Sequence, residues 1–232
     1  DFRLIITCAF FGMGLNMITS LNGLYNSTPI NSAIITTLAP IFIFIMSVVL
    51  LKEKITQIKY LGVFIGFIGT LALILLNEKS IANAPNINLG NFYFFINSLS
   101  YAIYFVLVKP LTKKYSMVTI MKWLFLFSII INMPFGLLEF TEINWDVISE
   151  NSLIKISYVV FCTTFLVYLL NLYALRNLKA STVGMFIYLQ PVIGILFAIY
   201  RGTDKLTVAD ITSVILVFAG VYLVSKRSTQ IT

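Results

Sequence analysis

Residues 38–54 read LAPIFIFIMSVVLLKEK, and residues 189–205 read LQPVIGILFAIYRGTDK. The two stretches begin 151 residues apart, and in each a proline near the start of an apolar run is followed, at its end, by an acidic residue and a lysine. The match extends across the stretch from Leu21 to Gly69, where the same offset aligns Gly69 with Gly220. Because a proline and an acid–lysine pair are unusual in apolar helices, we interpret the self-similarity as an internal repeat.

The composition is that of a membrane protein. Of the 232 residues, 59% are hydrophobic and 11% are charged, with a mean hydropathy of +0.95, whereas soluble domains average about 25% charged residues. Several apolar runs reach the length of about 20 residues that a helix needs to cross the hydrocarbon core. The short alternating strands of an outer-membrane barrel do not occur. We therefore predict an all-α, multi-pass protein whose surroundings are the lipid bilayer.

Eight transmembrane helices are expected, separated by joins that contain proline, glycine or charged residues. We place them at residues 4–21, 30–51, 58–76, 91–108, 117–138, 153–175, 180–200 and 208–225.

The basic residues indicate how these helices are oriented. The formal net charge is +7, but Lys and Arg are scattered through short joins and form no basic face, so no nucleic-acid partner is expected. When the chain alternates sides at each span, one side receives 12 of the 16 basic residues. The positive-inside rule makes that side cytoplasmic and places both termini in the cytoplasm. Its basic residues are Arg3, Lys52, Lys54, Lys59, Lys109, Lys113, Lys114, Lys122, Arg176, Lys179, Lys226 and Arg227.

The repeat also predicts how many helices the complete fold contains. At the 151-residue offset the first three spans pair with the last three, while residues 90–150, which hold two spans, have no partner. Their partners would precede residue 1, so we expect a ten-helix protein whose first two spans are absent from this chain. Five helices per half is an odd number, so the halves must be inverted relative to each other. Such halves are related by a pseudo-two-fold axis in the membrane plane, with the substrate site between them.

Specific motifs support a family resemblance. The segments 174–181 (ALRNLKAS), 188–192 (YLQPV) and 201–206 (RGTDKL) resemble the EamA repeat of the drug/metabolite transporter superfamily, in which an apolar helix with a central proline ends in an acid-containing turn. The first copy, from Leu38 to Ile55, followed by a glycine stripe, is similar to it as well. Asp204 stands where the family usually has Glu.

The resemblance implies a ten-helix fold of two inverted five-helix repeats in a bacterial plasma (inner) membrane, with both termini cytoplasmic. Residues 1–76 would hold the last three helices of the first repeat. Residues 77–89 would be an extracytoplasmic linker, and residues 90–227 would form the complete second repeat. The implied activity is secondary transport by alternating access, and we expect an exporter of small metabolites such as amino acids or other neutral or aromatic compounds. The alternative is a helical membrane scaffold or assembly subunit with no transported substrate.

Enzymatic chemistry is not expected. The chain has no His, no carboxylate near the middle of a predicted span, and two lone cysteines, Cys8 and Cys162. It therefore offers neither a nucleophile–base pair nor a metal-ligand cluster, and no cofactor or metal is predicted. The same lack of charge inside the spans predicts a neutral, aromatic or zwitterionic small-molecule substrate. The sequence leaves a homodimer open.

Polar side chains inside the spans are the candidates for a substrate cavity. Two spans carry them at helical spacing, so that each set lies on one face. The candidates are Asn97, Tyr101 and Tyr104 on one span, Thr164, Tyr168 and Asn171 on another, and Asn16, Thr36, Tyr188 and Gln190 elsewhere. Together they suit an aromatic cavity with a few polar groups. For each residue the alternative is a hydrogen bond to a neighbouring helix, worth about 0.6 kcal/mol on average.

Three further features have structural and functional interpretations. Pro40 and Pro191 are expected to kink their helices, either to line or gate the cavity or as simple packing bends. The glycine stripe at residues 62, 66 and 69 is expected to allow close helix packing. Glu53 and Asp204 are expected to cap the N-terminus of the next helix, with a gating salt bridge as the alternative.

Overall fold

The computed structural model describes residues 1–54, 56–76, 85–143, 145, 148–200 and 208–225. The regular structure within these ranges is helical, as the sequence predicts. The elements are α1 (Phe2–Ala9), η1 (Phe10–Leu15), α2 (Asn16–Asn26), α3 (Pro29–Thr36), α4 (Leu38–Leu51), α5 (Gln57–Leu76), α6 (Ile87–Lys114), α7 (Met117–Glu142), α8 (Glu150–Tyr158), η3 (Val159–Leu166), α9 (Val167–Asn177), α10 (Ala180–Met185), η4 (Phe186–Tyr188), α11 (Leu189–Tyr200) and α12 (Val208–Ser225).

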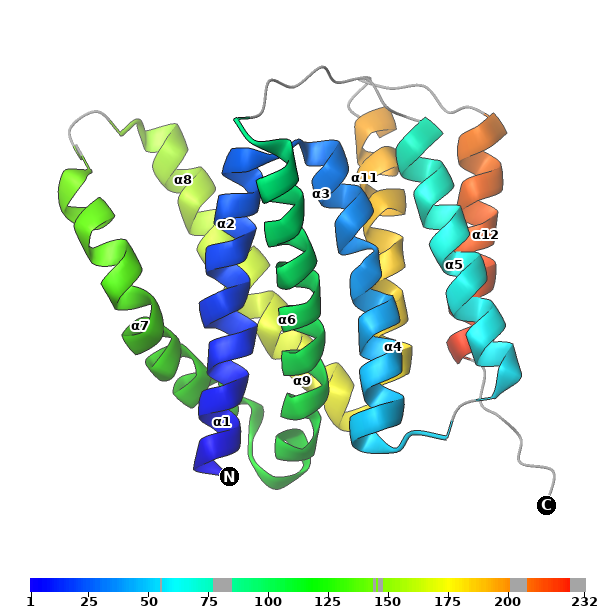
Figure 1. Cartoon of the computed structure of the whole chain (residues 1–232), viewed down its shortest axis with the longest axis horizontal. Helices are drawn as coiled ribbons and strands as arrows, with labels where there is room; N and C mark the ends of the chain where they lie inside the picture. Colours follow the sequence, from blue (N-terminus) through cyan, green and yellow to red (C-terminus); the bar gives the residue numbers. More distant parts are fainter. Residues whose placement is uncertain (55, 77–84, 144, 146–147, 201–207, 226–232) are drawn as a thin grey trace.

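Consecutive elements combine into long rods that run in alternating directions (Figure 1). The N-terminus lies at the lower end, from which α1, η1 and α2 rise as one rod; α3 and α4 then descend as the next. Five of the described rods are long and apolar enough to cross a membrane, and three more are shorter apolar helices. The five are Phe2–Asn26, Asn31–Leu51, Ile87–Lys114, Met117–Leu137 and Glu150–Asn177; the three are Gln57–Ala72, Ala180–Ile193 and Ile211–Ser225.

The helix boundaries repeat at the same 151-residue offset as the sequence. Equivalent boundaries are the ends of α2 and α9 at Asn26 and Asn177, and the starts of α3 and α10 at Pro29 and Ala180. Even the irregular turns correspond, because the offset carries the π-helical turn η1 onto residues 161–166 within the π-helical turn η3. Both copies therefore depart from regular α-helix at equivalent positions of the repeat.

Helices α5 and α12 pack against each other at backbone distance through small residues. A Cβ placed on Gly62 would lie 2.9 Å from the carbonyl oxygen of Gly220, and a Cβ placed on Gly69 would lie 2.9 Å from the carbonyl oxygen of Ser213. The offset converts Gly62 into Ser213 and Gly69 into Gly220, so the two contacts are images of each other. Reciprocal contacts of this kind are what a two-fold rotation produces.

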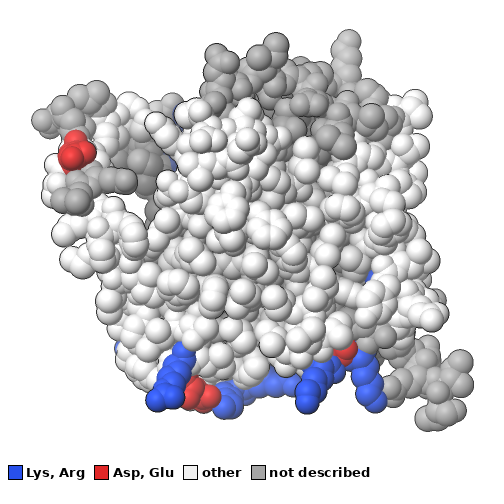
Figure 2. All heavy atoms as spheres, in the orientation of Figure 1, with Lys and Arg blue, Asp and Glu red and all other residues white. Residues whose placement is uncertain are grey.

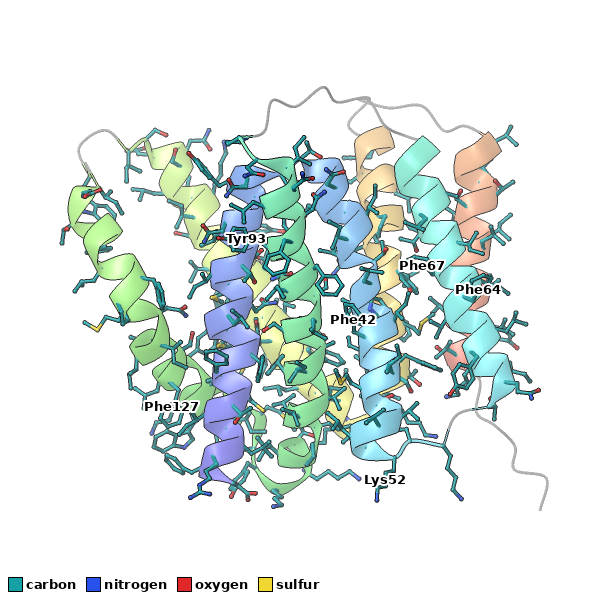
Figure 3. The ribbon with its side chains drawn as sticks, viewed as in Figure 1. Phe42, Lys52, Phe64, Phe67, Tyr93 and Phe127 are labelled. Atoms are coloured by element: carbon teal, nitrogen blue, oxygen red, sulfur yellow. The ribbon has the colours of Figure 1, made fainter. Side chains whose placement is uncertain are left out.

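The interior contains two apolar clusters. The larger one joins α1, η1, α4, α6, α7, α9 and α10. Phe127, on the lower part of α7 (Figure 3), packs against this cluster and also contacts the ring of Phe2. The smaller one joins α4, α5, α10, η4, α11 and α12 around Tyr188. Phe42 of α4 packs against the larger cluster, points toward α6 and meets the ring of Phe95 at 5.6 Å between centroids (Figure 3). Helices α4 and α10 contribute buried residues to both clusters and so connect them.

Positive charge gathers at one end of the molecule (Figure 2). All of the described Lys and Arg residues except Lys155 lie at helix ends or turns on the lower side. We call this side the lysine-rich end. It matches the side to which the sequence assigned most basic residues, as far as these residues are described; Lys79, Arg201, Lys205, Lys226 and Arg227 lie outside the described ranges, as do residues 77–84 of the expected linker.

Candidate functional site

Two neighbouring cavities flank the break between η4 and α11. The first, of about 280 Å³, is enclosed by α3, α5, η4 and α11 and is lined by Ser32, Ala33, Thr36, Thr37, Thr70, Ile187, Tyr188, Gln190 and Pro191. The second, of about 370 Å³, lies between α6, α9, α10 and η4 and is lined by Tyr101, Phe105, Val167, Leu170, Asn171, Ala174, Leu178, Val183, Phe186, Ile187 and Gln190. They share Ile187 and Gln190, so a ligand in one would adjoin the other.

Pro40 and Pro191 account for the position of the first cavity, because each leaves a backbone carbonyl without its helical donor. Pro40 and Pro191 cannot donate a backbone hydrogen bond to the carbonyl four residues earlier, which belongs to Thr36 and Ile187, respectively. The chain turns tightly just before each proline: Thr37 N–H donates to the Ile34 carbonyl at 3.2 Å, and Phe186–Tyr188 form a 3₁₀ turn. Both deprived carbonyl groups belong to residues that line the first cavity. Irregular backbone at membrane depth is tolerated where it borders a cavity or buried protein.

The hydroxyl groups of the first cavity present mainly acceptor atoms. Thr36 donates its hydroxyl proton to the carbonyls of Ser32 and Ala33 at 2.9 and 3.0 Å, Thr37 to Ile34 at 2.6 Å, and Thr70 to Gly66 at 2.8 Å. Each oxygen keeps lone pairs that can accept a hydrogen bond. Gln190 is exposed and supplies both a donor and an acceptor.

Tyr188 differs from the other buried polar residues of this cavity, Thr37 and Thr70, in the hydrogen bonding of its hydroxyl. Its side chain is 1% exposed, and its hydroxyl has no hydrogen-bond partner among the described residues. The ring lies against Gly66, where an added Cβ would be 3.0 Å from Tyr188 Cδ2. A buried hydroxyl without a partner is costly, so it is a natural position for a bound water or ligand.

The other three candidate tyrosines, Tyr101, Tyr104 and Tyr168, form an aromatic cluster between α6 and α9. Asn171 donates to the Tyr101 hydroxyl at 3.1 Å, and both residues line the second cavity. The rings of Tyr104 and Tyr168 lie 5.6 Å apart, and both side chains are buried. Tyr168 donates its hydroxyl proton to the Gly12 carbonyl of η1, so this residue bonds to a neighbouring helix. Tyr104 packs over Gly12, where a Cβ would be 2.5 Å from its ring.

Side chains from the other rods hold the carbonyl groups of the π-helical turn η1. Ser100 donates to the Phe11 carbonyl at 2.7 Å, Tyr168 to Gly12, and Asn132 to Met13 at 3.4 Å. One turn later, Asn16 and Asn97 exchange reciprocal bonds: each side-chain amide donates to the other's backbone carbonyl, at 3.2 and 2.7 Å. These bonds tie α1–α2 to α6, α7 and α9. For Asn16, Asn97 and Tyr168 the structure therefore shows the interhelical bonding that the sequence left as the alternative.

Thr164 lies apart from these groups. It is half-buried in η3, and its hydroxyl bonds to the Val159 carbonyl of its own rod at 3.1 Å. In contrast, Ser32, Thr37 and Thr70 line the first cavity but were not among the sequence candidates. The spacing of Ser32 and Thr36, four residues apart on one helix face, is the signal that could have found Ser32.

The cavity linings carry no Asp, Glu, Lys or Arg among the residues that the structure describes. In those same residues, no three His, Cys, Asp or Glu side chains come together as metal ligands would. The arrangement offers hydrogen bonds and aromatic surface, which suit an uncharged or zwitterionic ligand of small size.

A family model for EamA-like transporters matches residues 1–75 and 88–226. The chain belongs to this family. It is therefore an integral membrane protein of a transporter family.

Named relatives agree with the family. An uncharacterized transporter of Archaeoglobus fulgidus is 28% identical over 228 residues, which span 98% of this chain and 79% of the relative. The uncharacterized transporter YetK of Bacillus subtilis is 23% identical over 230 residues, or 99% of this chain and 70% of the relative. A WAT1-related protein of Arabidopsis thaliana is 25% identical and covers 93% of this chain and 62% of its own length.

The fold also resembles a solved structure. A crystal structure aligns with a TM-score of 0.81 at 13% identity, and the match covers 97% of this chain and 76% of the other. At this identity the likeness concerns the fold alone.

Proposed function

We propose that this EamA-family protein is a secondary transporter that exports a small neutral, aromatic or zwitterionic metabolite by alternating access between two inverted halves. The main support is the first cavity, which lies beside two proline breaks at equivalent places in the two copies and has an uncharged lining. A scaffold without a substrate would need no such cavity. The reciprocal contacts of α5 and α12 support halves related by a two-fold axis, as in other transporters with inverted repeats.

The proposal also covers the number of membrane spans, their orientation and the residues that contact the substrate. The eight rods would all span the membrane within a ten-helix fold. In that fold, the repeat equivalents of α6 and α7 would be two helices on the N-terminal side of α1. The lysine-rich end would face the cytoplasm of a bacterial cell, in keeping with the positive-inside rule. Asn171 and Tyr101 in the second cavity, together with Thr36, Tyr188 and Gln190 in the first, would contact the substrate. Pro40 and Pro191 would act as kinks that line the pathway.

Ligand binding gives the direct test. A library of neutral amino acids, nucleobases and aromatic amines is screened by thermal shift on the purified protein, because a ligand that binds the folded state raises its melting temperature. Tyr188→Phe removes the hydroxyl and keeps the ring, and Gln190→Ala removes the shared amide. We expect both variants to lose most of the ligand-induced shift. Thr163→Val, on the exposed side of η3, serves as the control and should keep it.

Transport then separates a transporter from a binding protein. The ligand that gives the largest shift is loaded into proteoliposomes, and its release is followed over time. A ligand that binds but does not cross the proteoliposome membrane would contradict the proposal. So would a screen in which no ligand gives a thermal shift that is lost in Tyr188→Phe.

A further inference from the structure

The two ends of the pathway are held in different ways. At the lysine-rich end, α4 and α10 are in direct contact: a Cβ placed on Gly184 would lie 2.8 Å from Ile43 Cγ2, so the glycine leaves room for the isoleucine side chain. The 151-residue offset carries Gly184 onto Ala33 and Ile43 onto Gly194. No large side chain is available for the equivalent contact between α3 and α11. The first cavity lies there instead, lined by Ala33.

Glu53 supplies the polar part of the closed end. Its Oε1 accepts a hydrogen bond from Ala180 N–H at 2.9 Å, and its Oε2 accepts one from the Ser181 hydroxyl at 2.7 Å. The prediction that Glu53 caps the next helix in the chain is wrong. The carboxylate crosses from the first repeat to the second and binds the start of α10.

The capping of α10 differs from that of four other helices. Helices α3, α6, α7 and α8 are capped by their own Thr28, Asn86, Ser116 and Ser149. The residue before α10 is Lys179, which has no side-chain acceptor and makes no such bond. The start of α10 therefore depends on a carboxylate from α4 for its side-chain cap. Hydrogen bonds to an ionised acceptor are about twice as strong as neutral ones.

The backbone before Glu53 turns it toward α10. Lys52, labelled at the lower end of α4 in Figure 3, adopts a left-handed conformation with φ 51°, and Glu53 N–H donates back to the Ser47 carbonyl at 3.2 Å. A non-glycine residue in this conformation costs about 1–2 kcal/mol. The turn is thus sharp, and it ends α4 at the place where the next side chain reaches the second repeat.

Lysines around the same contact reinforce it. Lys109 of α6 donates to the carbonyl of Leu178 and, at 3.4 Å, to that of Leu175, at the C-terminal end of α9. Lys179 donates to the Lys54 carbonyl at 3.5 Å. Glu53 is also within electrostatic range of Lys59 and Lys109. The Glu53 carboxylate therefore lies among several lysines of α5, α6 and the start of α10.

The opposite end cannot make the equivalent bonds. The offset carries Ala180 onto Pro29, which has no backbone N–H, and Ser181 onto Ile30, which has no hydroxyl. The counterpart of Glu53 is Asp204, which lies outside the described residues. The start of α3 is already capped by Thr28, whose hydroxyl accepts from Asn31 N–H at 3.1 Å. The first copy of the repeat therefore lacks both hydrogen-bond donors, the backbone N–H and the hydroxyl, that Glu53 uses in the second copy.

We propose that Glu53 is a one-sided latch, whose bonds to Ala180 and Ser181 hold the lysine-rich end of the pathway closed, whereas the equivalent residues at the other end, Pro29 and Ile30, offer neither donor. The proposal rests on the transport function proposed above. It means that the resting protein is biased toward the state in which the first cavity opens away from the lysine-rich end. Substrate movement through the lysine-rich end requires the Glu53 bonds to break.

Distances between spin labels test the latch. Cys162 is replaced by Ser, and the buried Cys8 is kept. One label pair, Leu50→Cys with Arg176→Cys, reports on the lysine-rich end, and a second pair, Leu24→Cys with Tyr200→Cys, reports on the opposite end; all four positions are exposed. Glu53→Gln keeps the shape and removes the charge. Glu150→Gln, an exposed acid at the start of α8, is the matched control.

In Glu53→Gln we expect the ratio of closed to open protein at the lysine-rich end to fall about tenfold, while the opposite pair moves closer together. Ser181→Ala removes one of the two bonds and should cause a smaller shift in the same direction. Glu150→Gln should match the wild type. Size-exclusion profiles identify any variant that fails to fold. If Glu53→Gln does not fold, the shift in Ser181→Ala still tests the latch.

Two outcomes would overturn the latch, and they are distinguishable. If the wild type shows two interconverting distances at both ends and Glu53→Gln and Ser181→Ala leave their ratio unchanged, alternating access stands and the latch is wrong. If neither the wild type nor any variant shows a second distance, with or without the ligand found by thermal shift, then alternating access fails and the latch fails with it.

Discussion

Gly220→Ala is the substitution that the contact between α5 and α12 should tolerate least. A Cβ at position 220 would lie 2.6 Å from both the carbonyl oxygen of Gly62 and the amide nitrogen of Gly66. Both are backbone atoms, so no change of rotamer can make room. Ordinary contacts of a Cβ begin at 3.4 Å, and the helices would have to separate by about 0.8 Å, the difference between 3.4 and 2.6 Å.

The cost follows from this separation. Overpacking a tight interior contact typically costs about 1–3 kcal/mol, and we expect Gly220→Ala to lower the free energy of unfolding by this amount. Gly66→Ala should cost less, because its nearest new neighbours, at 3.0 and 3.2 Å, are side-chain atoms of Tyr188 and Met185. The measurement is unfolding in mixed micelles with increasing dodecyl sulfate, followed by circular dichroism.

Gly136→Ala is the matched control, because an added Cβ at this position of α7 has no atom within 4 Å. Alanine is a better helix former than glycine by about 0.5–1 kcal/mol, so this variant should be at least as stable as the wild type. If Gly220→Ala unfolds at the wild-type dodecyl sulfate concentration while Gly136→Ala behaves as expected, the close reciprocal packing of α5 and α12 is refuted.

Two further predictions concern the other contacts between the rods. Asn16→Ala and Asn97→Ala should each destabilise the protein by about 0.6 kcal/mol, the average for interhelical bonds in membranes, because each removes one of the two amide donors. Unfolding free energies equal to that of the wild type in both variants would contradict this. Pro40→Ala and Pro191→Ala restore a backbone donor and should straighten their rods, so we expect slower transport in proteoliposomes without loss of stability. The exposed Pro134→Ala in α7 should transport at the wild-type rate, and an equal rate in all three would show that the two breaks are packing bends only.

The sequence was most informative where one residue type has one physical consequence. Long apolar runs can satisfy their backbone in lipid only as helices, so the rods could be placed before the structure was known. Proline removes a backbone donor, and the tight turns at Thr37 and at Phe186–Tyr188 directly precede Pro40 and Pro191, whereas α6 and α7 continue through Pro110 and Pro134. The glycines at positions 62 and 69 lie in close helix contact as expected, because a missing Cβ allows backbones to approach.

Partners across the fold could not be predicted in the same way. Ser100 and Asn132 were not among the sequence candidates, and their role in holding the Phe11 and Met13 carbonyls depends on how α6 and α7 pack against η1. Glu53 was assigned to the next helix because local capping is the usual pattern. Its actual partner is 127 residues away in the chain, and only the packing of α4 on α10 brings the two together.

The most direct test measures from which side of the membrane a reagent can reach the first cavity. Thr36→Cys and Gln190→Cys, both lining that cavity, are treated with a membrane-impermeant maleimide in right-side-out and inside-out vesicles, with the exposed Tyr25→Cys as a labelling control. We predict that both cavity positions react from the side opposite the lysine-rich end in the resting protein, and that Glu53→Gln makes them reactive from the lysine-rich side as well. Equal reactivity from both sides in the wild type, or none from either, would contradict a cavity that opens to one side at a time.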